Sequence, residues 1–375
     1  MIFSRSPARI TAGGRGEKIL IVQTSFLGDL VLSAPLIAEV KRRFPHGHLA
    51  VLCRAGLEGL LEGNLEVDEV LGYDKRGGLG GLWRKAQELR RRGFTVAISP
   101  HKSLRTALLL FLAGIPCRVG FRQSAGWFLY HYRADRLRSL HDVERNLSIL
   151  SAFGIRTSQC QRELRFTIDP VLARSVAARL ESMGLSRGRE RLRFGVSPGS
   201  VWPTKRWSVE GYAEVIRRLK EDYACEVLLF GGREDRPLAA RLEELTNHAA
   251  VDLSGCFSLR ELPAAIASCD LFICNDTGPM HIAVACGVPV VAIFCATTPS
   301  LGFYPYSYKA LVVEKALHCR PCSPHGGLRC PLGTEDCIRL IGPEDVIRAV
   351  RQALEVRGRG CHSGDDLYRP QFLTL

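Results

Sequence analysis

Short apolar runs rich in β-branched residues alternate with amphipathic stretches along most of the chain, and this alternation limits the possible folds more than any other feature. One amphipathic stretch, residues 34–44, has its apolar residues at helical spacing and its basic residues on the opposite face. Alternation of this kind predicts parallel sheets covered by helices on both faces. In the first half, strands are predicted at residues 18–23, 48–53, 67–73 and 95–100.

A less regular, polar stretch at about residues 156–191 interrupts the alternation, which then restarts. Strands are predicted there within the segments RFGVSPG, EVLLFGG, AVDLSG, LFICND and PVVAIF. A chain of 375 residues is long enough for two domains, each with its own core. We predict a disordered basic extension at 1–16, an α/β domain at 17–175, a second α/β domain at 190–342, a helix at 343–357 and a loose tail at 358–375.

Composition indicates an ordinary globular protein with a basic surface. The longest apolar run, residues 106–115, is far shorter than the roughly 20 residues that span a bilayer. The first 17 residues have no apolar block of the kind found in signal peptides, which favours a cytoplasmic location. The net charge is +13, and residues 1–150 contain 23 Lys and Arg against 13 Asp and Glu. Such a surface favours nucleic acid, phosphorylated small molecules or an anionic membrane as partner, or it serves solubility alone.

The first of three informative loops is QTSFLGDLVLSAP, residues 23–35. Ligands of open α/β sheets bind beyond the carboxyl ends of the strands, where this loop lies. Because Pro35 is tolerated only in a first helical turn, a helix must begin within a few residues of Asp29. Asp29 is therefore either an acidic residue that stabilises a helix N-terminus or a carboxylate that serves a site.

The other two loops have the character of phosphate sites. SPGSVWPTKRW, residues 197–207, combines turn-forming residues with Thr204 and Lys205, which suits a phosphate or a solvated basic turn. NDTGPMHIAVACGVP, residues 275–289, starts a small-residue helix whose first N–H groups suit a pyrophosphate, although Asp276 could instead cap that helix and His281 could be a buried core residue. The chain has no P-loop, no dinucleotide-binding glycine motif after the first strand and no D-x-D.

Taken together, the three loops resemble those of the ADP-heptose:lipopolysaccharide heptosyltransferases of glycosyltransferase family nine. The resemblance runs over residues 18–356 and includes SLRTALLLFLAGIPCRVGFR in the first half. It implies a GT-B fold, in which two Rossmann-like, doubly wound parallel-sheet domains face a central cleft. It also implies an inverting, metal-independent transfer of heptose from ADP-heptose to the lipopolysaccharide inner core.

The resemblance also implies roles for individual residues. Asp29 would be the general base that takes a proton from the acceptor hydroxyl, Lys205 and Thr204 would hold the ADP phosphates, and Glu234 would bind the ribose. The other expected donor contacts are Asp276, Thr277, Gly278, Pro279, Met280 and His281. The expected acceptor contacts are Gly28, Lys102, Arg105 and Arg122. The acceptor's carboxylates and phosphates would give the basic first domain a partner at the inner-membrane surface, with no role for nucleic acid.

The 14 cysteines fall into two groups. Ten are scattered, mostly in apolar runs, and are expected to be small buried residues in a reducing compartment. The other four have the spacing C-x2-C-x7-C-x6-C, of which only the first pair matches a zinc ribbon, so structural zinc is one interpretation. Similar loops occur in some family members that add the second heptose, and catalysis there needs no cofactor. These four are Cys319, Cys322, Cys330 and Cys337.

Other functions remain open from the sequence. A related transferase could use a different nucleotide sugar or acceptor, and a nucleotide-sugar epimerase of similar fold would need no lipid acceptor. A non-catalytic nucleotide-sugar or lipopolysaccharide-binding protein is a third alternative, although binding alone does not need Asp29 as a base. A nucleic-acid-binding protein would be expected to interleave aromatic residues with its basic ones or to carry a known module, and neither is found.

Overall fold

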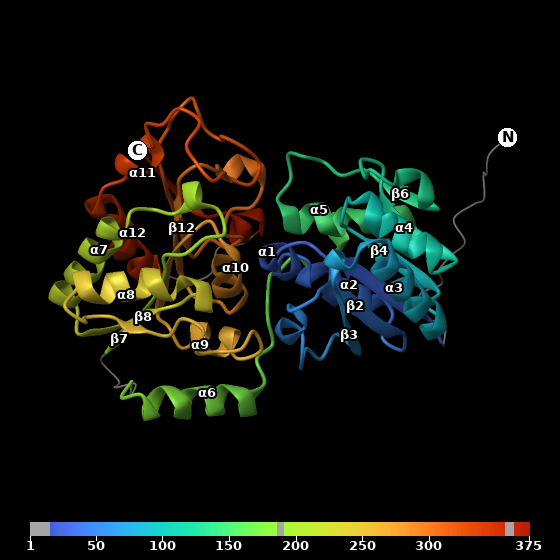
Figure 1. The fold of residues 1–375 in the computed structure, drawn as a ribbon, viewed down its shortest axis with the longest axis horizontal. Helices are drawn as coiled ribbons and strands as arrows, with labels where there is room; N and C mark the ends of the chain where they lie inside the picture. Colours follow the sequence, from blue (N-terminus) through green and yellow to red (C-terminus); the bar gives the residue numbers. More distant parts are fainter. Residues whose placement is uncertain (1–15, 186–190, 357–363) are drawn as a thin grey trace. The chain divides into compact units, whose positions relative to one another are not determined.

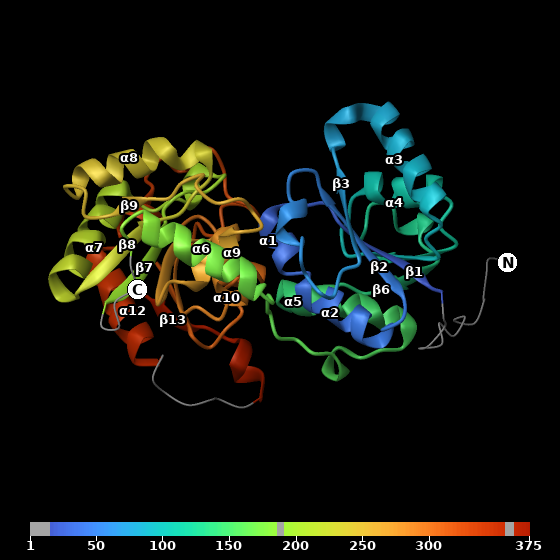
Figure 2. The same cartoon turned by 90° about the horizontal axis from the view of Figure 1, so that it is seen from below.

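A computed structural model describes residues 16–185, 191–356 and 364–375. The chain divides into two compact units, the first ending at Leu164 and the second beginning at Arg165. Each unit holds one parallel β-sheet with helices on its faces (Figures 1 and 2), so the predicted doubly wound α/β architecture is confirmed. Residues 1–15, most of the predicted basic extension, lie outside the described residues.

The first unit contains a sheet of six strands in the order β3-β2-β1-β4-β5-β6. Its strands are β1 (Lys18–Gln23), β2 (His48–Arg54), β3 (Glu69–Tyr73), β4 (Val96–Ser99), β5 (Cys117–Phe121) and β6 (Tyr132–Ala134). Its helices are α1 (Leu27–Val31), α2 (Ala34–Arg43), α3 (Gly78–Arg92), α4 (Leu104–Leu112) and α5 (Asp142–Ser148). Helices α3 and α4 lie on one face of the sheet, and α2 and α5 lie on the other (Figure 2).

The second unit contains a sheet of seven strands in the order β13-β12-β11-β10-β7-β8-β9. Its strands are β7 (Leu192–Ser197), β8 (Cys225–Leu229), β9 (Val251–Asp252), β10 (Leu271–Asn275), β11 (Val290–Phe294), β12 (Ala310–Glu314) and β13 (Gln371–Thr374). Its helices are α6 (Pro170–Ser182), α7 (Val209–Asp222), α8 (Arg236–Leu245), α9 (Leu262–Ala267), α10 (Gly278–Ala285), α11 (Asp336–Arg339) and α12 (Pro343–Val356). No helix in the described part of the chain is long and apolar enough to cross a membrane.

Two segments fall differently from the expected domain limits. The expected first domain extends to residue 175, but α6 begins at Pro170 and packs against α9 in the second unit. One reason is that Arg179 of α6 pairs with Glu261 at 3.4 Å and stacks over the ring of Phe257. The loose tail predicted at 358–375 is wrong for its last residues, because β13 pairs in parallel with β12 and so satisfies the backbone groups of that strand's free edge.

The strand order of each sheet reverses at one point, which determines where ligand loops gather. Strand β1 pairs with β2 on one side and β4 on the other, and β7 pairs in the same way with β8 and β10. Connections therefore leave in opposite directions after β1 and β4, and after β7 and β10. A crevice at the carboxyl ends of such strand pairs is the usual ligand site of open α/β sheets.

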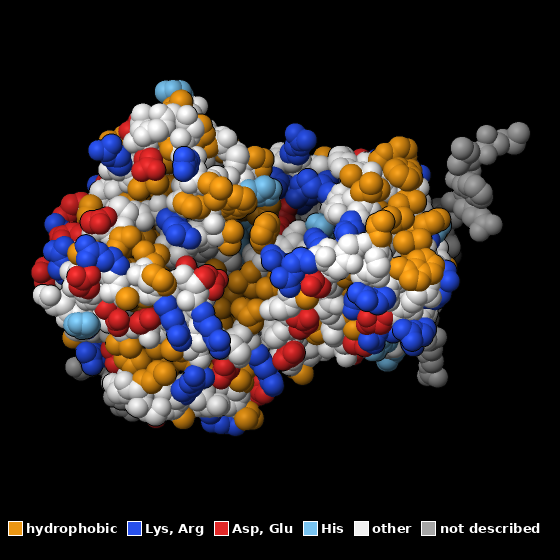
Figure 3. All heavy atoms as spheres, in the orientation of Figure 1, with side chains coloured by type: hydrophobic (Ala, Val, Ile, Leu, Met, Phe, Trp, Pro, Cys, Tyr) orange, Lys and Arg blue, Asp and Glu red, His pale blue; other side chains and the backbone are white. Residues whose placement is uncertain are grey.

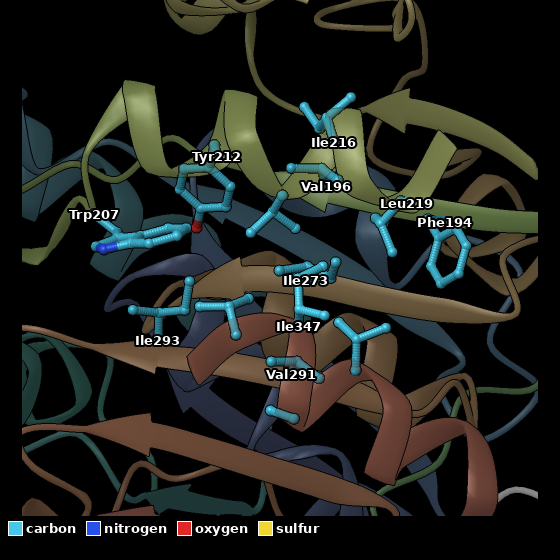
Figure 4. Close-up of a cluster of buried hydrophobic side chains, with 14 of the residues drawn as sticks. Phe194, Val196, Trp207, Tyr212, Ile216, Leu219, Ile273, Val291, Ile293 and Ile347 are labelled. Carbon is cyan, nitrogen blue, oxygen red and sulfur yellow. The ribbon is translucent and has the colours of Figure 1, made fainter. Parts of the chain in front are cut away.

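The core of the second unit fixes the loop that follows β7. Trp207 at the end of that loop packs edge-on against Tyr212 of α7 at 5.1 Å, and its indole N–H donates to the carbonyl of Ile341 at 3.1 Å. Figure 4 shows both rings in a layer of aliphatic side chains between α7, the sheet and α12. The buried indole of Trp207 therefore fixes the carboxyl end of the loop after β7.

Candidate active site

In the second unit, the switch point brings the loops after β7 and β10 together. Lys205, in a 3₁₀ turn at Pro203–Lys205, places its ammonium nitrogen 2.6 Å from Oδ2 of Asp276, the first residue after β10. The same oxygen accepts a 2.7 Å hydrogen bond from the hydroxyl of Thr297. Asp276 therefore orients Lys205 and does not cap the following helix, whose N-cap residue is Thr277. The ammonium group has three donors, so donors remain for an anion.

Asn275, the last residue of β10, joins the two loops and is a residue that the sequence interpretation did not single out. Its Oδ1 accepts hydrogen bonds from the backbone N–H of Trp207 and the hydroxyl of Tyr212, both at 3.0 Å. Its Nδ2 donates to the carbonyl of Pro198 at 2.7 Å. Asn275 is fully buried, and its hydrogen bonds hold both ends of the loop after β7 against β10. Because this loop carries Lys205, we call it the Lys205 loop.

Helix α10 begins directly beyond Asp276 and supplies further anion-binding capacity. The first N–H groups of any helix have no partner within that helix, and its dipole favours negative charge at this end. Thr277, Gly278 and Pro279 at this end are partly exposed, whereas Met280 and His281 are buried. Lys205 and the start of α10 thus form one positively polarised surface, which we call the anion cradle.

His281 lies in the first turn of α10 and is neutral near pH 7. Burial lowers its pKa to about 4, with Lys205 adding to the shift and Asp276 opposing it. Its Nδ1 is buried and has no hydrogen-bond partner among the residues that the structure describes. His281 is therefore buried, as one interpretation of the sequence predicted, but one nitrogen of its imidazole ring makes no hydrogen bond.

We expect the buried His281 and the half-buried His101 to make stability fall as the pH drops from about 6.5 towards 4. Burial also lowers the pKa of His101 to about 4, with Lys75 and Lys102 contributing. A pKa lowered in the folded state means that the unfolded chain binds the proton first, so the contribution is complete above pH 6.5 and is lost as the pH falls through the folded pKa. For the fully buried His281, a shift of this size corresponds to roughly 3 kcal/mol.

Urea unfolding of the wild type and of His281→Asn at pH 7.5, 5.5 and 4.5 measures this effect. The variant should show a smaller loss of stability between pH 7.5 and 5.5, a window above the one in which carboxyl groups titrate. Equal pH slopes for the two proteins would contradict a neutral buried His281.

The cysteine-rich segment, residues 319–337, packs on the Lys205 loop. The hydroxyl of Thr204 donates to the carbonyl of Gly327 at 3.0 Å and accepts from the N–H of Gly327 at 2.7 Å. Arg320 holds the same segment against the end of β11 and the loop that follows. Its Nη2 donates hydrogen bonds to the carbonyls of Phe294 and Thr297 at 2.8 and 2.6 Å. The Thr204 hydroxyl therefore binds the cysteine-rich segment in this structure. Its expected contact with a phosphate stays a prediction.

Gly326→Ala should disturb Lys205 specifically. Gly326 has φ of +83°, and a Cβ atom there would lie 2.8 Å from Cγ of Lys205. We expect at least a tenfold loss of donor affinity, in addition to backbone strain of about 1 kcal/mol. Gly333→Ala is the matched control, because Gly333 has φ of +72° with open space around it. Equal donor affinity in the two variants, measured by titration calorimetry, would show that the segment does not position Lys205.

The four clustered cysteines lie close enough together to affect the pKa of one another's thiols. Burial raises the pKa of Cys337 to about 11, and the other three thiols of the cluster contribute. Cys330 differs, because backbone N–H groups of residues 332–335, that of Glu335 above all, lower the pKa of its thiol. Among the described residues, no group of three or more His, Cys, Asp and Glu side chains is arranged to hold a metal ion. Structural zinc at Cys319, Cys322, Cys330 and Cys337 thus stays a prediction.

The loop after β8 carries Glu234, which is exposed in a 3₁₀ turn at Arg233–Asp235. Its neighbour Asp235 lies against the loop after β7, where a Cβ on Gly199 would be 2.3 Å from Oδ1 of Asp235. Burial raises the pKa of Asp235. Glu234 is more exposed than Asp235, although its carboxylate lies against Gly232, where a Cβ would be 2.3 Å from Oε2 of Glu234. Its expected contact with the ribose stays a prediction.

In the first unit, Asp29 occupies the first turn of α1, the short helix that follows β1. Its Oδ2 accepts a hydrogen bond from the backbone N–H of Phe26 at 3.1 Å. The carboxylate therefore stabilises the start of α1, which is the interpretation weighed against catalysis. The two roles are compatible, since Asp29 is only partly buried and a carboxylate accepts several hydrogen bonds.

Cations surround the switch point of the first sheet. Lys75, which follows β3, has its pKa lowered by burial and by the charges of Arg54 and Arg105, whereas the charge of Asp29 raises it. His101, which follows β4, shares a hydrogen bond of 3.3 Å between its Nδ1 and the hydroxyl of Thr24 in the Asp29 loop. The structure thus adds Lys75 and His101 to the residues near Asp29. Neither was identified from the sequence, because each lies on a different strand's loop.

The expected acceptor contacts differ in their surroundings. Lys102 has its pKa lowered by desolvation and then by Arg136, so it belongs to a cluster of cations. Arg105 is committed to the hydroxyl of Tyr73 at 2.7 Å and the carbonyl of Gly78 at 2.6 Å. Arg122 is exposed and lies 3.5 Å from Asp135. Gly28 is in the first turn of α1, beside Asp29.

Two doubly wound parallel-sheet units, one with a carboxylate and the other with an anion cradle at its switch point, agree with the GT-B architecture expected from the sequence. The chain belongs to glycosyltransferase family 9 (heptosyltransferase), whose family model matches residues 82–327. Among curated proteins it is similar to lipopolysaccharide heptosyltransferase 2 of Escherichia coli K12, with 29% identity over 309 residues that cover 79% of this chain and 88% of that protein.

Solved structures show the same fold. The structure of E. coli ADP-heptose lipopolysaccharide heptosyltransferase II matches with a TM-score of 0.75 and 24% identity, covering 91% of this chain and 100% of that one. E. coli heptosyltransferase WaaC with ADP-2-deoxy-2-fluoro heptose matches with a TM-score of 0.67 and 18% identity, covering 91% of this chain and 100% of that one. The GT-B fold expected from the three loops is therefore confirmed.

Proposed function

We propose that this glycosyltransferase moves heptose from ADP-heptose to a lipopolysaccharide inner-core acceptor that already carries a heptose. The observation that carries the donor assignment is the anion cradle, in which Lys205 and the start of α10 meet at one switch point. Support for heptose and for the core acceptor comes from the family and from the similarity to heptosyltransferase 2 of E. coli. The enzyme would work in the cytoplasm, at the surface of the inner membrane.

In the proposed reaction, the acceptor hydroxyl attacks the anomeric carbon of the heptose as its bond to the ADP oxygen breaks. Asp29 takes the proton of that hydroxyl, and inversion requires that the base and the leaving group lie on opposite faces of the sugar. Lys205 and the first N–H groups of α10 meet the negative charge that develops on ADP. Fixed donors of this kind can take the place of a metal ion, so we propose that the transfer needs none.

Turnover tests this proposal. Purified protein mixed with ADP-heptose and heptosylated Kdo2-lipid A should release ADP, and EDTA should leave the rate unchanged. Release of ADP only with other acceptors would point to a related transferase. No transfer to any lipopolysaccharide acceptor would contradict the proposed function.

A further inference from the structure

Large hydrophobic side chains are exposed together on one part of the first unit, on α4 and on the 3₁₀ turn that follows β5 at Trp127–Leu129. We call these residues the aromatic patch. Each keeps about half of its surface exposed, which is unusual for side chains of this size. The patch consists of Leu104 (48% exposed), Phe111 (49%), Trp127 (48%) and Phe128 (61%). Figure 3 shows hydrophobic side chains gathered over the region where Figure 1 labels α4 and β6.

The patch is continuous across its two segments. Gly126 lies so close to α4 that a Cβ on it would be 2.4 Å from Cβ of Ala107 and 3.3 Å from Cδ1 of Leu104. Arg118 links the segments from β5, since its guanidinium lies 5.4 Å from the ring centre of Phe111 and its Nε donates to the carbonyl of Leu129 at 2.9 Å. The exposed rings therefore lie on one continuous surface that is packed against the rest of the first unit.

Cations accompany the aromatic rings. The guanidinium of Arg133 lies 5.1 Å from the ring centre of Trp127. Residues 101–138, which include the patch, contain seven Lys and Arg and only one acidic residue, Asp135. Exposed Trp and Phe beside Lys and Arg are typical of surfaces that lie in the headgroup region of an anionic bilayer.

We propose that the aromatic patch docks this enzyme on an anionic phospholipid bilayer, with Trp127 and Phe128 entering the headgroup region and the neighbouring cations binding lipid phosphates. The proposal rests on the proposed function, because a lipid-anchored acceptor is available only at a membrane. A second copy of the chain is a poorer occupant. A symmetric contact would bring two strongly basic segments together, and like charges at an interface oppose association.

Vesicle binding of the full chain tests this inference. Wild-type protein should co-sediment with vesicles that contain phosphatidylglycerol and phosphatidylcholine in equal parts, and only weakly with phosphatidylcholine alone. The double variant Trp127→Ser, Phe128→Ser should lose about tenfold or more of this binding, since both anchoring rings are removed. Val171→Ser is the matched control, because Val171 is 64% exposed but lies on α6 of the second unit. Trp127→Phe should keep the binding and lose most of the blue shift in tryptophan fluorescence.

The same variants separate this inference from the proposed function. With an acceptor dispersed in detergent, the double variant should turn over as fast as wild type. If the wild-type enzyme does not transfer heptose in this assay, the proposed function is wrong. The docking inference is then still tested, because vesicle binding is measured without turnover. The docking inference is overturned if the double variant binds vesicles as wild type does. It is equally overturned if wild type binds no anionic vesicles. A wild-type dimer that the double variant splits would then identify a second copy of the chain as the occupant of the patch.

Discussion

Asp29→Asn should lower kcat by at least about 100-fold while leaving donor binding and stability almost unchanged. An amide oxygen can still accept the hydrogen bond that Oδ2 now receives from the N–H of Phe26, so the start of α1 keeps its partner. The amide cannot take a proton from an acceptor hydroxyl at neutral pH. The variant therefore removes the proposed base and leaves the observed capping role in place.

Asp29→Ala is the matched comparison, because it removes both roles. We expect the same loss of kcat together with about 1 kcal/mol of stability, the usual effect of losing a helix cap. Binding of ADP-2-deoxy-2-fluoro heptose, measured by calorimetry, should stay within twofold of wild type in both variants. A kcat for Asp29→Asn within tenfold of wild type would show that another group is the base.

Lys205→Met should abolish efficient turnover by removing the main cation of the anion cradle. Loss of one charge-stabilising donor in a transition state costs about 2.7 to 4 kcal/mol, which corresponds to roughly 100-fold to 1000-fold in kcat. The variant also leaves Asp276, whose side chain is 8% exposed, without its ion-pair partner. Breaking a buried ion pair from one side typically destabilises a protein by about 3 to 5 kcal/mol, so instability alone could mimic the expected result.

A double variant resolves this ambiguity. Lys205→Met with Asp276→Asn removes the unpaired carboxylate, and the Asn oxygen can still accept the hydroxyl of Thr297. We expect its stability to return towards that of wild type while turnover stays low. Lys205→Arg keeps a cation and should retain part of the activity. Recovery of wild-type turnover in the double variant would mean that Lys205 is a structural residue only.

Strong local patterns in the sequence were sufficient to predict much of the fold. Strands β1 to β4 and the helix at Ala34–Arg43 were predicted to within two residues of their limits, because their apolar residues follow strand or helix spacing without interruption. Strands β5 and β6 were missed, since they are short and carry Arg118 and Arg133 in place of continuous apolar runs. Strand β13 is held by the free edge of β12, which no local pattern reports.

The candidate site was predicted in part for a similar reason. The loops with Asp29, Lys205 and Asp276 follow buried strands, so their place at the sheet edge follows from the strand pattern. What the sequence could not show is which alternative each residue takes. Asp276 pairs with Lys205 across 71 positions of sequence, and Asn275 bonds to Trp207 across 68 positions. Such contacts depend on the strand order of the folded sheet, which places β7 beside β10.

A crystal structure with ADP-2-deoxy-2-fluoro heptose would show directly whether the second unit binds the sugar donor. We expect the diphosphate in the anion cradle, within hydrogen-bond distance of Nζ of Lys205 and of the first N–H groups of α10, with the ribose near Glu234. A diphosphate bound away from Lys205, or at the switch point of the first sheet, would contradict the assignment of the second unit as the donor site.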